Sequence, residues 1–202
     1  DNCNNLAVCV QTIQVQDTTK PIIICPQNIV VECDQPTGPT NTGAATATDN
    51  CAPVPSVAFS DVITPGGLCP QEYSIARTWV AKDTCGNTAS CMQTITVDDS
   101  KPPVMVCAPN VTVDCHLDLT PGLGKPTGIT TATDNCDSSP TVLLDDEVII
   151  SGNCPVVDTI FRTWVALDDC ANGTACVQRI IVIDVRPPLL TCQKDTVINC
   201  GT

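Results

Sequence analysis

Residues 73–97 read YSIARTWVAKDTCGNTASCMQTITV, and they carry the strongest secondary-structure signal in the chain. They predict two β-strands, Tyr73–Lys82 and Ala89–Val97, because β-branched and aromatic residues are frequent in both and a Cys-Gly-Asn turn separates them. The second strand has a period of two, with Ile95 and Val97 on one face and threonines on the other. Such alternation is typical of a strand that buries one face.

The elements of this stretch recur along the chain. A shift of 85 residues lays Arg77-Thr78-Trp79 on Arg162-Thr163-Trp164, and it lays Asp49-Asn50-Cys51 on Asp134-Asn135-Cys136. Before Cys51 the shift falls to 82, because residues 116–126 contain a three-residue insertion. The pattern also continues outside the two complete repeats. Cys3 and Cys9 have the spacing of Cys85 and Cys91, and Cys192 and Cys200 have the spacing of Cys25 and Cys33. Self-similarity at a fixed period indicates a tandem array of one structural unit.

The repeat divides the chain into four parts: the last strand and linker of a preceding repeat (1–18), two complete repeats (19–100 and 101–185), and the first strand of a following repeat (186–202). Further strands are predicted at Asn28–Glu32, Ala44–Thr48 and Val57–Ile63, and no segment has the apolar period of a helix. A domain of roughly 85 residues with six or seven short strands fits an immunoglobulin-like sandwich, so we expect an all-β chain of tandem Ig-like β-sandwich domains. We expect the partial repeats at both ends to be completed by further repeats. They would belong to one continuous polypeptide or, less simply, to identical subunits joined head to tail.

Composition restricts the function and the location. Nine Lys and Arg against 22 Asp and Glu give a net charge of −13, which disfavours nucleic acid and anionic membrane surfaces as partners. No apolar run approaches the roughly 20 residues of a membrane span. The 202 residues include 16 cysteines, a density typical of disulfide-built extracellular chains. A zinc site is disfavoured, because the nearest cysteines are six residues apart and His116 is the only histidine. We therefore predict a protein stapled by disulfides, outside the cell or on its surface.

Strand direction narrows the fifteen possible pairings of the six cysteines in a repeat. If successive strands alternate between a near and a far end, Cys33 and Cys69 meet at the far end, and Cys51 and Cys85 meet at the near end. Cys25 lies early in the first strand, which in such sandwiches lies beside the last strand and its cysteine. The expected disulfides are Cys25–Cys91, Cys33–Cys69 and Cys51–Cys85, and likewise Cys107–Cys176, Cys115–Cys154 and Cys136–Cys170. The alternative joins sequence neighbours, as Cys33–Cys51 and Cys69–Cys85.

Four motifs together resemble a known family. They are the linker Asp99-Ser-Lys-Pro-Pro-Val-Met-Val-Cys107, the Asp-Asn-Cys element, the Arg-Thr-Trp strand and the segment Asp83-Thr-Cys-Gly-Asn-x₃-Cys91. In this order they are similar to hyalin-type (HYR-like) repeats, which are immunoglobulin-like modules strung in tandem in secreted and cell-surface proteins, often bacterial. The chain departs from that family in having six cysteines per repeat, where hyalin repeats usually carry one disulfide. The resemblance implies an adhesive or structural role and no catalysis.

The residues themselves form no recognisable catalytic constellation. His116 lies in the insertion and has no counterpart in the first repeat, so an exposed loop residue is expected. Arg77 and Arg162 each lie two residues before a tryptophan, and each guanidinium is expected over the indole at a sandwich surface. No glycine-rich phosphate loop follows a strand, so no nucleotide site is predicted. We expect that the protein is not an enzyme.

Carboxylates and amides gather at the near end of each repeat. The first group is Asp17, Asp49, Asn50 and Asp83, and the second is Asp99, Asp134, Asn135, Asp168 and Asp169. Oxygen ligands from two loops and a linker are what Ca²⁺ takes, so each group is a candidate calcium site. The competing interpretation is that these residues cap turns through local hydrogen bonds.

Glycan acceptors are also present. Asn110-Val-Thr and Asn172-Gly-Thr fit the N-glycosylation pattern, and Thr18, Thr159 and Thr196 follow aspartates in a motif similar to one that is O-glycosylated in some Gram-negative secreted proteins. The sequence as a whole predicts a structural component of an extracellular rod or fibre, whose partners are neighbouring repeats or identical subunits. The alternative function is an adhesin stalk, or a glycan- or protein-binding module, on the cell surface.

Overall fold

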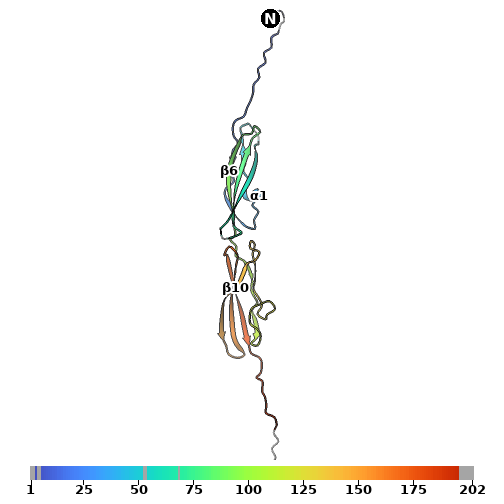
Figure 1. The fold of residues 1–202 in the computed structure, drawn as a ribbon, viewed down its shortest axis with the longest axis vertical. Coiled ribbons are helices and arrows are strands. Elements are labelled where there is room, and N and C mark those ends of the chain that lie inside the picture. The colour runs from blue at the N-terminus through green and yellow to red at the C-terminus, as the bar shows by residue number, and fades with distance from the viewer. Residues whose placement is uncertain (1–2, 4–5, 52–53, 68, 196–202) are drawn as a thin grey trace, which may run out of the picture. The chain divides into compact units, whose positions relative to one another are not determined.

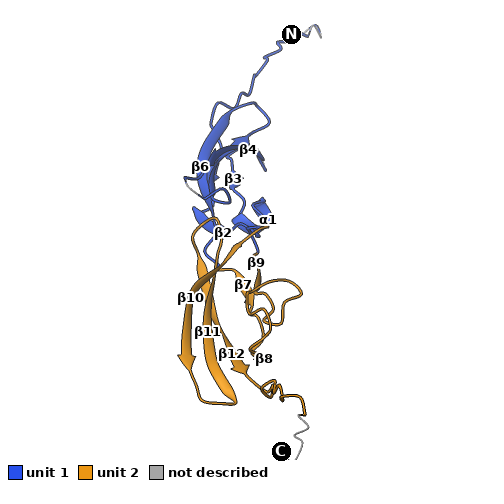
Figure 2. Ribbon diagram, turned by 60° about the horizontal axis from the view of Figure 1, so that its bottom comes forward, with its two compact units in different colours: residues 1–101, 135–137 blue, residues 102–134, 138–202 orange. Residues whose placement is uncertain are grey.

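The computed structural model describes residues 3, 6–51, 54–67 and 69–195, and its chain divides into two compact units. Unit 1 comprises residues 1–101 together with 135–137, and unit 2 comprises 102–134 and 138–202 (Figure 2). Both units are built from β-strands arranged as packed sheets, which confirms the predicted all-β sandwich class.

Among its described residues, unit 1 contains six strands and one turn of helix. They are β1 (Ile22–Ile24), β2 (Ile29–Glu32), α1 (Pro39–Thr42), β3 (Thr46–Thr48), β4 (Ser56–Pro65), β5 (Tyr73–Lys82) and β6 (Thr88–Asp98). Figure 1 labels β6 and α1 of this unit. One sheet has the order β2-β6-β5-β4, and a two-stranded sheet pairs β1 with β3. The chain crosses from the small sheet to the large one at Pro26, which has no N–H to continue a ladder. β2 then pairs in parallel with β6.

Unit 2 repeats this topology. Its strands are β7 (Val104–Val106), β8 (Val111–Asp114), β9 (Thr131–Thr133), β10 (Thr141–Ser151), β11 (Val156–Leu167) and β12 (Gly173–Ile183). They form a sheet of order β10-β11-β12-β8 and a two-stranded sheet of β7 and β9. One difference is a register shift between Leu144 and Asp146, where β10 carries an extra residue opposite β11. The sequence repeat is therefore a repeat of structure.

Each unit has a small aliphatic core. Val31, Ile75, Ile95 and Val97 form it in unit 1, and Val113, Ile160, Ile180 and Val182 form it in unit 2. Burial alternates along β6, so the face predicted for Ile95 and Val97 is the buried one. Cores of this size stabilise a domain only modestly, which leaves a large share of stability to disulfides and buried polar contacts.

The terminal segments form no strand among the described residues. Residues 6–20 and 184–195 are without regular structure, and Leu6, Val8 and Val10 are 87%, 76% and 84% exposed. The strands expected in the partial repeats 1–18 and 186–202 are therefore not formed where the structure describes them. A single segment without a neighbouring strand has no ladder to join, which explains the difference. None of the helices in the described part of the chain is long and apolar enough to cross a membrane.

Candidate functional site: cysteines and carboxylates at the repeat ends

One disulfide joins the two sheets inside each unit. The Cys25–Cys91 and Cys107–Cys176 disulfides are both present, with Cα–Cα distances of 5.9 and 6.1 Å. Cys25 directly follows β1 and Cys91 lies in β6, so the first bond links the small sheet to the large one. A buried tryptophan lies opposite the β6 or β12 cysteine in the neighbouring strand, Trp79 in unit 1 and Trp164 in unit 2. This pairing of a disulfide with a buried tryptophan is typical of immunoglobulin-like sandwiches.

The partner of Cys33 corrects the expected pairing. Cys33 is bonded to Cys136, not to Cys69. Residues 135–137, which carry the Asp-Asn-Cys cysteine of the second repeat, belong to unit 1 and not to the unit of their sequence neighbours. The error was to assume that a cysteine at the far end of a repeat finds its partner within the same repeat. The structure instead joins it to the following repeat.

The remaining expected pairs also need correction. Cys136–Cys170 is excluded by the bond from Cys136 to Cys33. Neither Cys51–Cys85 nor Cys115–Cys154 is formed, because these four cysteines carry free thiols. The alternative pairing of Cys33 with Cys51, and of Cys69 with Cys85, is likewise not formed. Cys69 and Cys170 are each disulfide-bonded.

Local contacts hold the free thiols of Cys51 and Cys115. Asn50 Nδ2 donates to Cys51 Sγ at 3.1 Å, and the pKa of Cys51 is raised by burial and by the negative charges of Asp17 and Asp49. The Cys115 Sγ lies 3.3 Å from His116 Nδ1. Burial and nearby aspartates raise the pKa of Cys115 as well. Both groups are therefore kept as protonated thiols at neutral pH.

The first predicted acidic group is assembled within unit 1. Carboxylate oxygens of Asp17, Asp49 and Asp83 all lie within 4.8 Å of one another, and Asn50 follows Asp49 directly in the chain. Asp17 comes from the linker, Asp49 from the end of β3 and Asp83 from the turn after β5. Asp49 Oδ1 is buried and accepts no hydrogen bond in the described structure. Three carboxylates from three segments thus meet as the sequence predicted.

Asp83 also caps its own turn. Its Oδ1 accepts hydrogen bonds from the backbone N–H groups of Cys85 and Asn87 at 2.9 and 2.8 Å, and its Oδ2 accepts one from Asn87 Nδ2 at 2.8 Å. Burial by itself would raise the pKa of Asp83, but the hydrogen bonds to Asn87, Cys85 and Gly86 outweigh it and lower the pKa. The carboxylate is therefore ionised at neutral pH whether or not a cation is bound.

The second predicted acidic group is divided between the units. Asp99 and Asn135 belong to unit 1, and Asp134, Asp168 and Asp169 belong to unit 2. Asp99 is buried, and its carboxylate lies within 4.8 Å of the sulfur atoms of Cys33 and Cys136. Asp168 repeats the turn-capping geometry of Asp83, because its Oδ1 accepts from the N–H groups of Cys170 and Asn172 at 2.9 and 2.8 Å. Asp169 is exposed.

The recurring arginines are buried and not at the surface, contrary to expectation. Arg77 is 2% exposed and donates to both carboxylate oxygens of Asp61 at 2.8 Å, to Thr42 Oγ1 at 3.0 Å and to the Thr37 carbonyl at 2.9 Å. Its guanidinium lies 4.5 Å from the centre of the Phe59 ring and 5.8 Å from that of Trp79. In unit 2 the β10 register shift places Glu147, not Asp146, opposite Arg162, and Arg162 Nε donates to Glu147 Oε2 at 2.5 Å. These groups are structural and are closed to a ligand.

Two buried glutamines were missed in the sequence. Gln93 is fully buried, and its Nε2 donates to the carbonyls of Gln27 and Thr42 at 2.9 and 2.7 Å. Gln178 makes the same contacts in unit 2, to the carbonyls of Pro109 and Thr127 at 2.9 and 2.6 Å. The available signal was their recurrence at the 85-residue shift, on the inward face of the last strand. They tie that strand to two loops.

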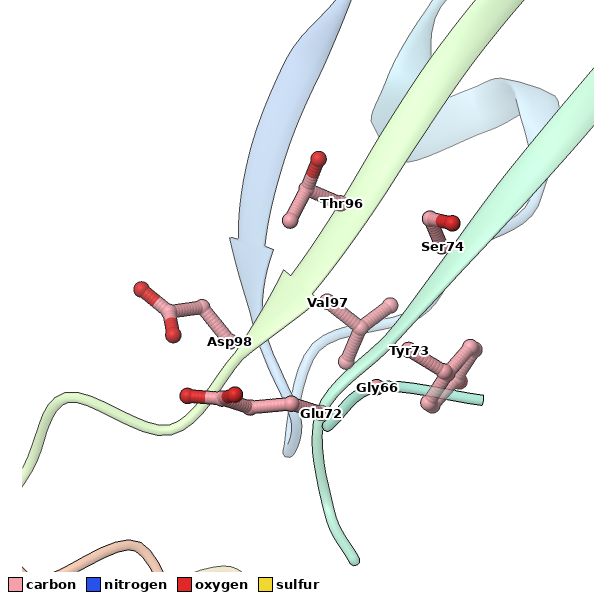
Figure 3. A pocket seen from close by; sticks show the side chains of 7 residues that line it. All are labelled: Gly66, Glu72, Tyr73, Ser74, Thr96, Val97 and Asp98. Atoms are coloured by element: carbon pink, nitrogen blue, oxygen red, sulfur yellow. The ribbon is translucent and has the colours of Figure 1, made fainter. Parts of the chain in front are cut away.

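A pocket of about 180 Å³ lies in unit 1, where β5 begins and β6 ends (Figure 3). Its lining residues are Gly66, Glu72, Tyr73, Ser74, Thr96, Val97 and Asp98. The Glu72 and Asp98 side chains lie next to each other in Figure 3, and the pKa of Glu72 is raised by a hydrogen bond with Asp98, by burial and by the charge of Asp98. Val157 and Ile183 stand at the equivalent positions of unit 2, so this carboxyl pair does not recur with the repeat.

The predicted glycan acceptors differ in accessibility. Asn110 is exposed, and its Oδ1 accepts from the Arg179 N–H at 2.7 Å, which leaves the Nδ2 that would carry a glycan outside this contact. Asn172 Nδ2 donates to Asp168 Oδ2 at 3.0 Å. Thr18 is exposed and Thr159 lies half-buried in β11. Thr196 and Cys200 lie outside the described residues.

Comparison with known proteins finds structural likenesses only. No protein family and no curated protein matches the chain. Cadherin domains 1–4 of protocadherin gamma B7 match with 13% identity and a TM-score of 0.34, over 82% of this chain and 51% of that one. Human protocadherin-24 EC1-2 has 13% identity and a TM-score of 0.34, over 84% and 100%. The CBM51-2 and INT domains of Clostridium perfringens ZmpB, solved with GlcNAc, have 15% identity and a TM-score of 0.31, over 82% and 44%. Scores this low do not assign the chain to a family.

Proposed function

We propose that this chain is a segment of an extracellular rod or fibre, built from tandem disulfide-rich immunoglobulin-like repeats of the hyalin type. The observation that carries this proposal is the Cys33–Cys136 disulfide. A covalent bond from the first repeat to the Asp-Asn-Cys element of the second restricts how the repeats reorient about their linker. Such a restriction suits a protein that transmits tension along its length, and its partners are then neighbouring repeats or identical subunits.

Two further properties support an extracellular structural role without catalysis. Disulfides persist in oxidising compartments and are rare in the cytosol. The buried polar side chains that recur in both repeats are used in internal hydrogen bonds, as Arg77 with Asp61 and Gln93 with the Thr42 carbonyl illustrate. Groups so engaged are not available to bind or transform a substrate.

The test is small-angle scattering of the oxidised 202-residue chain and of a variant in which Cys33, Cys136, Cys69 and Cys170 are all replaced by serine, so that no disulfide of the repeat ends remains. We expect a single elongated particle for the unmodified chain. The variant should give a broader distribution of distances, since the remaining linker residues allow reorientation. The matched control is Cys9→Ser with Cys192→Ser, which removes two exposed free thiols and should change nothing. If the unmodified chain gave a distance distribution as broad as that of the variant, the proposal would be contradicted.

We propose calcium as the ion held by Asp17, Asp49 and Asp83. Three carboxylates within 4.8 Å of one another repel each other unless a cation or protons neutralise them, and the low pKa of Asp83 disfavours protons there. The buried Asp49 Oδ1 accepts no hydrogen bond and is the oxygen best placed to coordinate an ion. Ca²⁺ takes six to eight oxygen ligands, so backbone carbonyls and water would complete the shell.

Calcium should therefore stabilise unit 1. At an ion concentration of about ten to a hundred times the Kd, the gain in stability is about 1.4–2.7 kcal/mol, which raises the melting temperature by roughly 5 °C or more. Asp49→Asn should remove most of this increment. Asp146→Asn makes the same charge change at an exposed position of β10 and should keep it. Scanning calorimetry with Ca²⁺ and with EDTA measures both. An unchanged melting temperature would leave turn-capping as the role of these residues.

A further inference from the structure

The ends of the two repeats carry cysteines in two different states. In the Cys33–Cys136 disulfide, a cysteine at the end of a first strand is joined to the Asp-Asn-Cys cysteine of the next repeat. Cys115 holds the first of these positions in the second repeat, and Cys51 holds the second position in the first repeat. Both are free thiols. Cys115 and Cys51 are therefore equivalent to the two partners of the Cys33–Cys136 disulfide, but each lacks a bonded partner.

Cys115 is presented in the same way as Cys33. The Cys33 N–H donates to the Asp98 carbonyl at 2.9 Å, and the Cys115 N–H donates to the Ile183 carbonyl at 2.9 Å. Each cysteine directly follows a short strand that pairs in parallel with the last strand of its repeat, β2 with β6 and β8 with β12. The backbone thus holds both cysteines at equivalent positions of their sandwiches.

The local surroundings of Cys51 also match those of Cys136. Asn135 Nδ2 donates to Cys136 Sγ at 2.7 Å, and Asn50 Nδ2 donates to Cys51 Sγ at 3.1 Å. The linker aspartate also acts on the cysteine in both cases: Asp99 lies within 4.8 Å of the Cys136 sulfur, and Asp17 is near enough to Cys51 to raise the pKa of its thiol. The surroundings that hold a bonded cysteine in one repeat therefore hold a free one in the other.

A second set of cysteines follows the same distribution. Cys69 and Cys170 are each disulfide-bonded, whereas their equivalents in the other repeat, Cys154 and Cys85, are exposed free thiols. Two positions are thus bonded in one repeat and free in the other, as for Cys51 and Cys115. These eight cysteines form four equivalent pairs, and in every pair one cysteine is bonded and the other is a free thiol.

We propose that Cys51 and Cys115 are the two halves of a repeat-to-repeat disulfide, in which Cys115 bonds to the Asp-Asn-Cys cysteine of a following repeat and Cys51 to the strand-end cysteine of a preceding one. The partner is a further repeat of this kind, in the same polypeptide or in a second copy of the chain. The proposal rests on the fibre function proposed above and specifies the chemistry of its junctions. The bonded pair in the structure, with a Cα–Cα distance of 5.9 Å, is its geometric template.

The bond forms by oxidation. Two S–H bonds break and one S–S bond forms, so the two thiols release two protons and two electrons. A small-molecule disulfide such as oxidised glutathione accepts them, and its own S–S bond is cleaved to give two thiols. The thiolate is the attacking species, so the reaction should become faster as the pH rises toward the raised pKa values of Cys51 and Cys115.

The test uses two copies of the chain expressed in tandem, with Asp184 of the first copy in the place of Asp17 of the second. Cys51→Ser in the first copy and Cys115→Ser in the second remove the outer pair of such thiols. Serine also replaces Cys3, Cys9, Cys85 and Cys154 of the first copy and Cys85, Cys154, Cys192 and Cys200 of the second, so that only the two junction thiols stay free. After folding in a glutathione buffer, peptide mapping without reduction should recover Cys115 linked to Cys51, and alkylation should find neither thiol free. The matched control adds Cys115→Ser in the first copy, and there Cys51 of the second copy should be alkylated. Two free junction thiols, in a chain whose Cys25–Cys91 and Cys107–Cys176 bonds are intact, would overturn the proposal.

A second experiment avoids the tandem chain and tests separate copies. One single-copy chain carries Cys51→Ser and a second carries Cys115→Ser, and the two are mixed in the same buffer. In both chains serine also replaces Cys3, Cys9, Cys85, Cys154, Cys192 and Cys200. The mixed dimer should exceed each self-linked dimer by far more than the factor of about two that random pairing gives. A ratio near the random 1:2:1 would count as random thiol oxidation and against the proposal. Scattering from the tandem chain separates this question from the fibre itself. An elongated tandem chain with free junction thiols would retain the fibre and reject the disulfide.

Discussion

Replacing Cys25 and Cys91 together by alanine should lower the free energy of unfolding of unit 1 by about 4 kcal/mol, since the bond closes a loop with a sequence separation of 66 residues. The loss should be large relative to total stability, because the aliphatic core cluster described in unit 1 is small, with four buried residues. The bond also ties the small sheet, β1 and β3, to the large one. Without it, the small sheet is held by few other contacts.

Urea denaturation of the double variant and of the unmodified chain measures this effect. Cys9→Ala is the matched control, because it removes an exposed thiol that forms no disulfide, and it should leave the transition unchanged. The urea concentration at the midpoint of unfolding should be lower in the double variant, while the slope of the native baseline should change little. A loss of less than about 1 kcal/mol would mean that the sheets hold together without the bond.

Asp61→Ala should destabilise unit 1 by about 3–5 kcal/mol, because it leaves the charge of Arg77 buried without its carboxylate. Asp34→Ala is the control: its ion pair with Lys101 is exposed, with side chains 33% and 47% accessible, and its removal should cost below about 1 kcal/mol. Thermal and chemical denaturation would measure both. If Asp61→Ala and Asp34→Ala lowered the stability by equally small amounts, water would be solvating Arg77 in place of the Asp61 carboxylate, and the prediction would be wrong.

The same ion pair should give unit 1 a defined pH dependence. The hydrogen bond from Arg77 holds the pKa of Asp61 below its ordinary value of 3.8, so the folded state binds the proton more weakly than the unfolded chain. The stability from this pair is therefore present above about pH 4 and is lost as the pH falls through the lower folded pKa. Asp61→Ala should remove this part of the acid dependence, which denaturation at a series of pH values would detect.

The strand pattern allowed most of the fold to be predicted from sequence. Tyr73–Lys82 was expected as a strand and is β5 with the same bounds, because its inward residues alternate and turns limit it on both sides. The division of the first strand into β1 and β2 was missed, since Pro26 breaks the ladder without leaving a gap in the apolar pattern. The helix Pro39–Thr42 was missed because one turn is too short to have a period.

The disulfide framework was only partly predictable, for a different reason. Strand direction assigns each cysteine to an end of its sandwich, and this assignment was enough for Cys25 and Cys91. It does not decide whether a cysteine at that end bonds within its repeat or to the next one. Cys33 therefore had two possible kinds of partner, and the structure selects Cys136.

The burial of Arg77 shows what the same alternation could have revealed. Arg77 shares the inward register of β5 with Ile75 and Trp79, but an arginine is placed at the surface by default. Its burial depends on Asp61, which faces it across the β4–β5 ladder. That register is a property of the folded sheet and is not available from the composition of either strand.

Non-reducing peptide mapping of the oxidised 202-residue chain shows whether the first repeat is covalently joined to the second. The chain is alkylated, digested without reductant, and its linked peptides are identified by mass spectrometry. The peptide containing Cys33 should be recovered with the peptide containing Cys136. Recovery of Cys33 linked to Cys69 would place this disulfide within one repeat and would show that the covalent junction between the repeats is not formed.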